Sequence, residues 1–283
     1  MQLSSLSDEL EALGGSTRVS RYDVCLLVGP RPEGREAPSI VRRRGAGVVV
    51  RDPRAPADTP SGQCERSFAL PAVFDAHADP AHAALAQHVS QRVASDLVNG
   101  FNASVVAFGQ SGTGKTHALL GACAWPAAGA PPVLPAIVAA VIELTAIHGF
   151  DTFQLGVSCW ELAADQVVDL LAPEPLSAVS PNLHLRRIPG LCLEHTCLKV
   201  ESVADLNATL AFARSRSCNW APSGGSQHAL PNRAHSFVRV VLHNKQHSWL
   251  SLLHVVDLAG DGLEGLEGHL RVGVDRLGAD GLA

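Results

Sequence analysis

The sequence predicts an α/β fold, a sandwich of strands and helices, and three observations support this class. Short apolar runs spaced like strands alternate along the chain with stretches whose apolar residues recur every three or four positions. A glycine-rich loop, residues 109–116, lies between one such strand and one such helix. The 283 residues are 46% apolar and 17% charged, which allows a sizeable core and excludes global disorder.

Three features precede this loop in the sequence. The apolar run 22–28 predicts a strand that stops at the turn signal Gly29-Pro30. Residues 33–66 mix Arg, Pro, Gly and Asp, which predicts a hairpin or a long surface loop around the β-rich residues 48–50. An apolar cluster then follows within residues 68–74, formed by Phe68, Leu70, Val73 and Phe74.

A helix is predicted after Asp79-Pro80, because an oxygen-bearing cap followed by proline is a common helix start. Apolar residues then recur every fourth position until Asn99-Gly100 ends the helix; they are Leu85, Val89, Val93 and Leu97. Residues 105–108 predict a short buried strand. Further along, we expect a helix that contains the apolar face 134–142 and strands at 153–159, 237–242 and 250–256.

Composition and charge exclude several classes of protein. The 22 Lys and Arg against 27 Asp and Glu give a net charge of −5, so the basic character of many nucleic-acid binders is absent. No apolar run is long enough for a transmembrane helix, and the N-terminus lacks the basic start of a secretory signal. The seven cysteines and 13 histidines show no zinc-site spacing, which favours reduced cytosolic cysteines. We therefore expect neither nucleic acid nor a membrane as a partner.

The loop 109–116 fits the phosphate-binding pattern G-x-x-x-x-G-K-[ST] at every fixed position. Glycines let successive backbone N–H groups point at a phosphate, and the lysine reaches the β and γ phosphates while the threonine hydroxyl binds Mg²⁺. The predicted phosphate-binding residues are Gly109, Gln110, Ser111, Gly112, Thr113, Gly114, Lys115 and Thr116. Only three residues of the chain are lysine, and one of them stands at this position.

A second motif supports nucleotide binding. The apolar strand 252–256 ends in Asp257, and Gly260 follows three residues later. In many P-loop NTPases such an Asp holds a water on Mg²⁺ and the Gly N–H binds the γ-phosphate. The motif is weak alone but moderately strong beside the phosphate loop.

Together these motifs resemble the kinesin motor domain, in the family's order and over about residues 21–262. Residues 101–110 resemble the family's G-Y-N-x-T-I-F-A-Y-G-Q, and residues 68–74 its F-x-F-D-x-V-F. Val157 to Leu162, with Asp169-Leu170-Leu171 downstream, resembles V-S-x-x-E-I-Y-N-E-x-x-x-D-L-L. Residues 257–260 are identical to the start of D-L-A-G-S-E.

The resemblance implies a three-layer P-loop NTPase sandwich, with a mixed central sheet flanked by helices and incomplete at its C-terminus. It implies ATP and Mg²⁺ as cofactors, with Thr116 and Asp257 at the metal. Adenine contacts are expected from Arg31, Pro32 and His117. The switch motifs supply Arg233, His235, Asp257 and Gly260. For Glu161, which matches a family position on a strand, a structural hydrogen bond is expected rather than catalysis.

The departures from the family pattern fall at the reaction centre. The first switch has Pro231-Asn232 in place of two serines, and Ala234 in place of a third. Gly262 stands where the family has the Glu that pairs with the switch Arg, and Gly29 replaces one adenine-contacting Arg. Loss of one group that positions the attacking water commonly lowers a rate on the order of 10²-fold. We therefore expect ATP binding with weak turnover.

By resemblance the chain divides into an N-terminal extension 1–20, a motor-like domain 21–262 and a glycine-rich tail 263–283. The tail lacks a recognisable form of the family's microtubule-binding helix. The family implies microtubules as partner and a cytoplasmic, cytoskeletal location. Because tubulin's surface is acidic and this chain is net negative, this segment alone is expected to bind microtubules weakly. The alternatives are an ATP-dependent motor, a non-hydrolysing scaffold for cytoskeletal or signalling partners, and an unrelated P-loop NTPase, against which the motif order argues.

Overall fold

The structure is a computed structural model of the whole chain. It describes residues 23–28, 41–45, 47–52, 54–56, 58–75, 81–109, 113–121, 131–147, 152–163, 166–173, 195–217 and 234–259. The chain divides into two compact units, residues 1–75 and 76–283, and each is described here by itself. The boundaries predicted at residues 20 and 262 fall outside the described ranges. No helix among the described residues combines the length and apolarity needed to cross a bilayer.

The first unit contains two small sheets. Strand β1 (Cys25–Val28) pairs in parallel with β5 (Ala72–Asp75). Strands β2 (Val41–Arg44), β3 (Gly47–Arg51) and β4 (Glu65–Ala69) form an antiparallel sheet, with the one-turn helix α2 (Ser61–Cys64) before β4. The hairpin predicted within residues 33–66 is therefore confirmed as β2–β3, and β4 adds a third strand to it.

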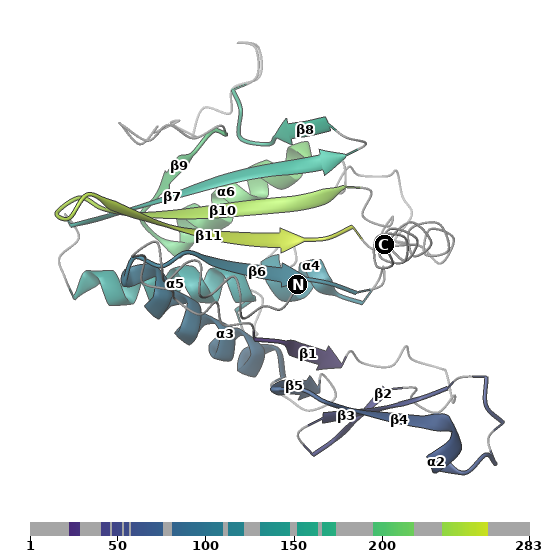
Figure 1. Cartoon of the computed structure of the whole chain (residues 1–283). Helices are drawn as coiled ribbons and strands as arrows, with labels where there is room; N and C mark the ends of the chain where they lie inside the picture. The colour runs from purple at the N-terminus through teal and green to yellow at the C-terminus, as the bar shows by residue number, and fades with distance from the viewer. Residues whose placement is uncertain are drawn as a thin grey trace, which may run out of the picture. The chain divides into compact units, whose positions relative to one another are not determined.

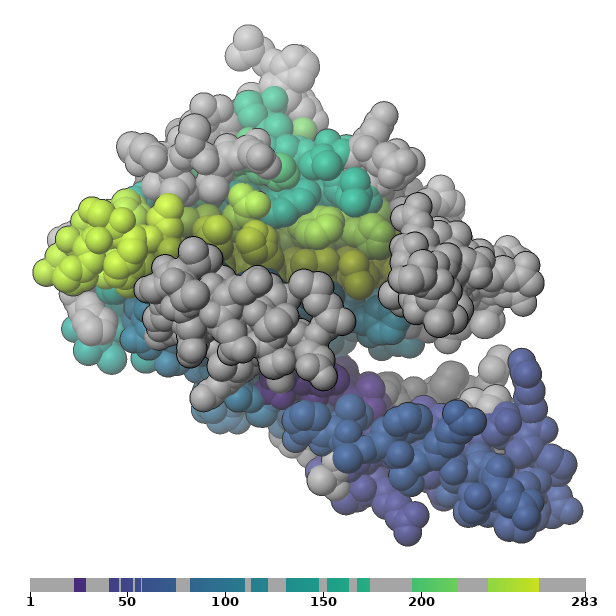
Figure 2. All heavy atoms as spheres, viewed as in Figure 1, coloured from purple at the N-terminus to yellow at the C-terminus, as the bar shows by residue number. Residues whose placement is uncertain are grey.

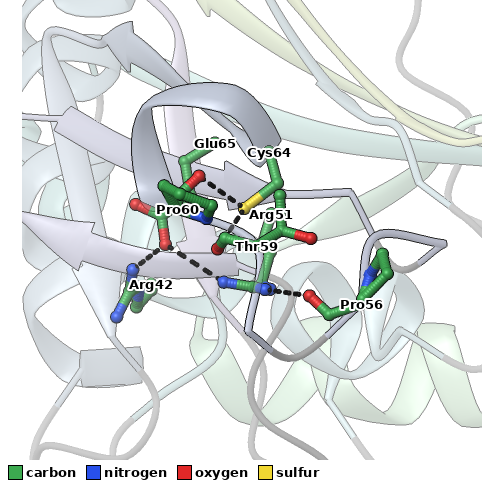
Figure 3. A network of polar contacts seen from close by, with 7 residues as sticks. All are labelled: Arg42, Arg51, Pro56, Thr59, Pro60, Cys64 and Glu65. Carbon is green, nitrogen blue, oxygen red and sulfur yellow. Dashed lines mark hydrogen bonds and ion pairs between the residues drawn. The ribbon is translucent and has the colours of Figure 1, made fainter.

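A polar network joins this sheet to the turn before α2 (Figure 3). The carboxylate of Glu65 forms an ion pair with the guanidinium of Arg42, and it also lies 4.0 Å from a guanidinium nitrogen of Arg51. Arg51 in addition donates to the carbonyl of Pro56 at 2.8 Å, and the Cys64 thiol donates to two carbonyls of the turn. Because the Arg42 side chain is exposed, these contacts fix local geometry more than they add to the free energy of unfolding.

The second unit is built on a mixed sheet in the order β6-β11-β10-β7-β8, with β9 also pairing with β7 (Figure 1). Only β6 and β11 are parallel; the other neighbours are antiparallel. The strands are β6 (Ala103–Ala107), β7 (Phe153–Ala163), β8 (Gln166–Asp169), β9 (Leu198–Val200), β10 (His235–Asn244) and β11 (Trp249–Asp257). The helices among the described residues of this unit are α3 (Ala81–Val98), α4 (Lys115–Leu120), α5 (Val133–Ala146) and α6 (Val203–Arg216).

The core lies between one face of the sheet and these helices. Val157, Val240 and Leu253 share that face through the strand register and are fully buried. On the same face the Ser251 hydroxyl donates to the carbonyl of Leu97 in α3 at 2.8 Å. In Figure 1 helix α6 is seen behind strands β7 and β10, and atoms of the β10–β11 hairpin are exposed on the face shown in Figure 2. The predicted α/β class, mixed sheet and flanking helices are confirmed.

The predicted burial of one strand was wrong. Strand β6 forms as expected, but its residues alternate between half-buried and exposed, with Val106 56% and the following Phe108 89% exposed. The reason is position: β6 is the last strand of the sheet order and buries only the face toward the helices. Phe68, in the apolar cluster predicted at residues 68–74, is half exposed.

In the second unit, three of the described elements had no prediction: α6, β8 and β9. Helix α6 was missed because its buried face includes Thr209 and Ala213 beside Leu206 and Leu210, which weakens the apolar period. Ser202 starts this helix by accepting a hydrogen bond from the Asp205 N–H at 3.1 Å. The strands β8 and β9 have only four and three residues, too few for a clear alternation.

Candidate functional site

The site lies where β6 and β11 end, because these two strands run parallel and in register. Ala107 at the end of β6 faces Asp257 at the end of β11. The chain leaves β6 directly into the predicted phosphate loop, and α4 begins at Lys115. Strand pairing therefore carries the second motif to the first, although 141 residues separate Thr116 from Asp257. The carboxyl ends of parallel strands are where α/β proteins usually bind ligands.

Glycine is required at both ends of the loop. Gly114 precedes α4 with a φ of +87°, a left-handed conformation that disfavours side chains. At Gly109 a Cβ atom would lie 3.0 Å from the Thr113 hydroxyl, so the two ends of the loop approach closely. Three predicted phosphate-loop residues, Gln110, Ser111 and Gly112, lie outside the described residues.

The Lys115 side chain folds back over the loop. Its ammonium donates to the carbonyl of Gly109 at 2.8 Å, and the side chain is partly buried. The positive charge is therefore held beside the start of the loop rather than extended into solvent. A phosphate bound by the loop would meet this charge without a large movement of the lysine.

Thr116 and Asp257 are in direct contact, since the threonine hydroxyl donates to the aspartate carboxylate. Asp257 is only 2% exposed, so its carboxylate is held by packing. A hydroxyl and a carboxylate are oxygen ligands of the kind that Mg²⁺ prefers. The two residues predicted for the metal are thus brought together, and their chemistry fits a magnesium ion.

The two motifs that the sequence predicts as switches are also joined. His235, the first residue of β10, accepts a hydrogen bond at Nδ1 from the N–H of Ala259, at 3.1 Å. Ala259 lies two residues after β11 ends. Arg233 and Gly260, the neighbouring switch residues that the sequence predicts, are outside the described residues.

The predicted adenine contacts are only partly described. His117 is exposed on α4, and its ring packs edge-on against the ring of His82 of α3, with centroids 5.5 Å apart. Burial, and then His117, lower the pKa of His82, which favours its neutral form. Arg31 and Pro32 lie outside the described residues. The ring contact between His82 and His117 could not be predicted from the sequence, because a histidine on a half-buried helix face is common.

Glu161 makes the structural hydrogen bonds that the sequence predicts for it. Its carboxylate, 2% exposed on β7, accepts from the hydroxyls of Ser217 and Ser236. The serine partners were not predicted, because serines occur throughout the chain and only the fold selects these two. A buried carboxylate is costly unless hydrogen bonds satisfy it, and both hydroxyls supply such bonds.

Arg214 is a further residue that the sequence did not indicate. From the last turn of α6 its guanidinium donates to the carbonyls of Leu120 and Gly121, at 2.8 and 2.9 Å. These carbonyls end helix α4, where the helix leaves them without partners. Helix α6 therefore supports the helix that carries Lys115 and Thr116.

The geometry suits one chemical task, which is to hold a phosphorylated ligand together with a magnesium ion. A lysine, a hydroxyl and a buried carboxylate converge at the ends of two parallel strands. The described part of the site is thus suited to binding and orienting phosphates.

Comparison with known proteins places this arrangement in a family. The family model of the kinesin motor domain matches residues 40–266. The chain is 26% identical over 189 residues to kinesin-like protein KIN-5C of Nicotiana tabacum and 26% identical over 208 residues to the human chromosome-associated kinesin KIF4A. It is 27% identical over 193 residues to kinesin-like protein Nod of Drosophila melanogaster. These alignments cover 59%, 69% and 66% of this chain.

The same alignments cover 18%, 16% and 25% of the three relatives, so the chain spans a quarter or less of their lengths. Among solved structures, the fold is similar to KIF14 residues 391–755, with ADP and in complex with a microtubule. That match has a TM-score of 0.62 at 19% identity, and it covers 88% of this chain and 71% of the other. Since the family model matches most of the sequence, this chain belongs to the kinesin motor domain family.

Proposed function

We propose that this chain is an ATP-binding, microtubule-associated kinesin motor domain in which hydrolysis is weak. The observation that carries the proposal is the contact between Thr116 and Asp257, which unites the phosphate loop with the second switch. Membership of the family supports ATP as the nucleotide, microtubules as the partner and the cytoskeleton of the cytoplasm as the location.

Each residue of the site has a defined task in this proposal. The loop N–H groups and Lys115 hold the β and γ phosphates, and His117 lies against the adenine together with Arg31 and Pro32. Thr116 would bind Mg²⁺, and Asp257 would hold the ion through a water. The ion supplies charge neutralisation for the triphosphate. Arg233 and the N–H of Gly260 are assigned to the γ-phosphate by the resemblance of their motifs to the family.

Weak turnover follows from what the switches lack. Ala234 lies directly before β10, where the family has serine, and it is 1% exposed. Its side chain has no hydroxyl, and its burial leaves little room for a bound water to act in place of one. Asn232 and Gly262 replace a serine and a glutamate that position water and close the site in the family. Binding depends chiefly on backbone N–H groups, Lys115 and the metal ligands, and these are retained.

The alternative is a scaffold that binds nucleotide, or none, and serves as a docking platform for cytoskeletal or signalling partners. The altered switches favour it, since a scaffold needs no attacking water. The two functions differ in turnover: a motor releases phosphate and microtubules accelerate that release, whereas a scaffold does neither.

The test combines three measurements on the whole chain: binding of a fluorescent ATP analogue, phosphate release, and co-sedimentation with microtubules. We expect saturable binding that Lys115→Ala weakens at least tenfold, while Lys245→Ala, an exposed lysine in the β10–β11 turn, leaves it unchanged. Family-like phosphate release stimulated by microtubules would contradict weak turnover. Absence of binding, with Lys115→Ala behaving like the parent, would contradict the nucleotide itself.

A further inference from the structure

Helix α4, which begins with Lys115 and Thr116, is too short to hold its own position. It has six residues, and isolated helices of that length are not stable in water, so its place depends on contacts with other elements. At its first turn the Thr116 hydroxyl donates to Asp257 of β11. At its other end, the last carbonyls have no N–H partner within the helix.

The far end of α4 is held from two sides. Gly121 ends the helix with a φ of +79°, and a Cβ atom at this position would lie 2.6 Å from Pro132, the residue before α5. From the other side the Arg214 guanidinium donates through Nη2 to the carbonyls of both Leu120 and Gly121. Its positive charge also suits the partial negative charge at a helix C-terminus. One arginine therefore satisfies two carbonyls that the helix leaves open.

Arg214 makes this contact from an anchored helix. Helix α6 has 14 residues and a buried inner face, and it packs against α5, β7 and β9. Arg216, two residues after Arg214, donates to the carbonyls of Leu170 and Ala172, which follow β8. The last turn of α6 thus carries two arginines that each bond two carbonyls, but on two different segments of the chain.

We propose that Arg214 is a positioning residue for the phosphate loop, because it holds the far end of α4 and thereby the side chains at its start. A rise of 1.5 Å per residue puts Leu120 about 8 Å from Lys115 along the axis, so a tilt of α4 moves Lys115 and Thr116 relative to Asp257. Binding groups act well only when they are held within about 0.5 Å of their places. As far as it concerns nucleotide, this proposal rests on the proposed function.

The first experiment needs no nucleotide. Hydrogen exchange followed by mass spectrometry reports on the opening of α4 through a peptide that covers residues 115–121, in which the N–H groups of Ala118 and Gly121 are bonded. Arg214→Met keeps much of the apolar stem but has no donor, and we expect it to accelerate this exchange about tenfold. Arg214→Lys keeps the charge and can donate to the same carbonyls, so it is expected to stay within about twofold of the parent.

A matched control separates positioning from general destabilisation. Arg216→Met removes a guanidinium from the same turn of α6, and it is expected to leave exchange in residues 115–121 unchanged even if it lowers the urea midpoint as much as Arg214→Met does. If Arg214→Met fails to fold, Arg214→Gln carries the test, because it loses the charge and is expected to accelerate exchange about fivefold. Equal acceleration by Arg216→Met, or parent-like exchange in the Arg214 variant, would overturn the proposal.

The second experiment measures the affinity for fluorescent analogues of ATP and ADP. Arg214→Met is expected to weaken both about tenfold, because the loop and Lys115 would hold the β-phosphate that the two nucleotides share. Arg214→Lys and Arg216→Met are expected to stay within about twofold of the parent. Parent-like affinity in Arg214→Met would overturn the link between α4 and phosphate binding. A parent chain that binds neither nucleotide would refute the proposed function alone, since the exchange result stands without it.

Discussion

His235 accepts a hydrogen bond at Nδ1 from the backbone N–H of Ala259, at 3.1 Å, and so joins the start of β10 to the chain just beyond β11. A ring nitrogen that accepts carries no proton, so Nδ1 is the acceptor nitrogen of this ring in the contact. The contact joins the two predicted switch motifs directly.

Replacing His235 tests this coupling. The Oδ1 of asparagine can occupy the place of Nδ1 and accept the same hydrogen bond, whereas alanine cannot. We expect His235→Ala to lower the free energy of unfolding by about 1 kcal/mol and His235→Asn to lower it by clearly less, in urea titrations at neutral pH. Equal losses in the two variants would contradict a role for the hydrogen bond.

The proposed metal ligands predict a particular dependence on magnesium. Thr116→Ala removes the hydroxyl but leaves Lys115 and the loop in place, so nucleotide affinity in Mg²⁺ is expected to fall about tenfold and affinity in EDTA to change less. Thr116→Ser keeps the hydroxyl and is expected to remain near the parent. Titration of a fluorescent nucleotide with and without EDTA measures the difference. An Ala variant with the same loss in both conditions would point to a folding defect instead of a metal site.

Two buried cysteines are expected to be chemically inert. Burial, and then the nearby Asp169 carboxylate, raise the pKa of the Cys159 thiol, and burial raises that of Cys197. A raised pKa lowers the fraction of reactive thiolate, so a disulfide reagent at neutral pH should modify neither residue until the protein unfolds. Cys25, which is only half-buried, serves as the reactive comparison. Peptide mapping after labelling checks this, and rapid labelling of Cys159 in the native protein would contradict it.

His254 predicts a loss of stability on mild acidification. Burial, and then the charge of Arg239, lower the pKa of His254, whose Nε2 accepts from the Arg239 side chain at 3.0 Å. As the pH falls, His254 therefore takes up a proton at a higher pH in the unfolded state than in the folded state. The stabilising contribution is complete above the ordinary histidine pKa of about 6.5 and declines as the pH falls from there through the lower folded-state pKa.

His254→Gln keeps an acceptor for Arg239 but does not titrate. Its free energy of unfolding should consequently fall less than that of the parent between pH 7.5 and pH 5.5, as measured by urea unfolding at each pH. Arg239 also lies 4.8 Å over the Trp160 ring, which holds the guanidinium in place in both proteins. A parent and a variant with parallel pH profiles would show that His254 contributes nothing to this dependence.

Much of the site could be predicted from the sequence because its motifs are local. The pattern around Lys115 specifies loop, lysine and hydroxyl within eight residues, and the structure adds only that the ammonium rests on Gly109. Helix α3 was predicted with its end at Asn99-Gly100, since four apolar residues at a spacing of four identify it and Gly100 adopts a φ of +84°.

The interactions that support the site could not be predicted, because each depends on elements far apart in the sequence. Arg214 reaches α4 across 93 or 94 residues, and Ser217 reaches Glu161 across 56. Only the order of strands in the sheet decides which serine or arginine meets which partner. The predicted burial of β6 was wrong for the same reason, since an edge strand and a central strand can have the same local sequence pattern.

The central claim is that the chain binds ATP but hydrolyses it slowly, and a single-turnover experiment tests it most directly. Excess protein is mixed with a limiting amount of ATP labelled on the γ-phosphate, with Mg²⁺ and microtubules, and bound ATP and free phosphate are followed together. We predict that ATP becomes bound and remains mostly intact over many minutes, with little effect of microtubules. Rapid conversion of the bound ATP to phosphate, accelerated by microtubules, would contradict the claim.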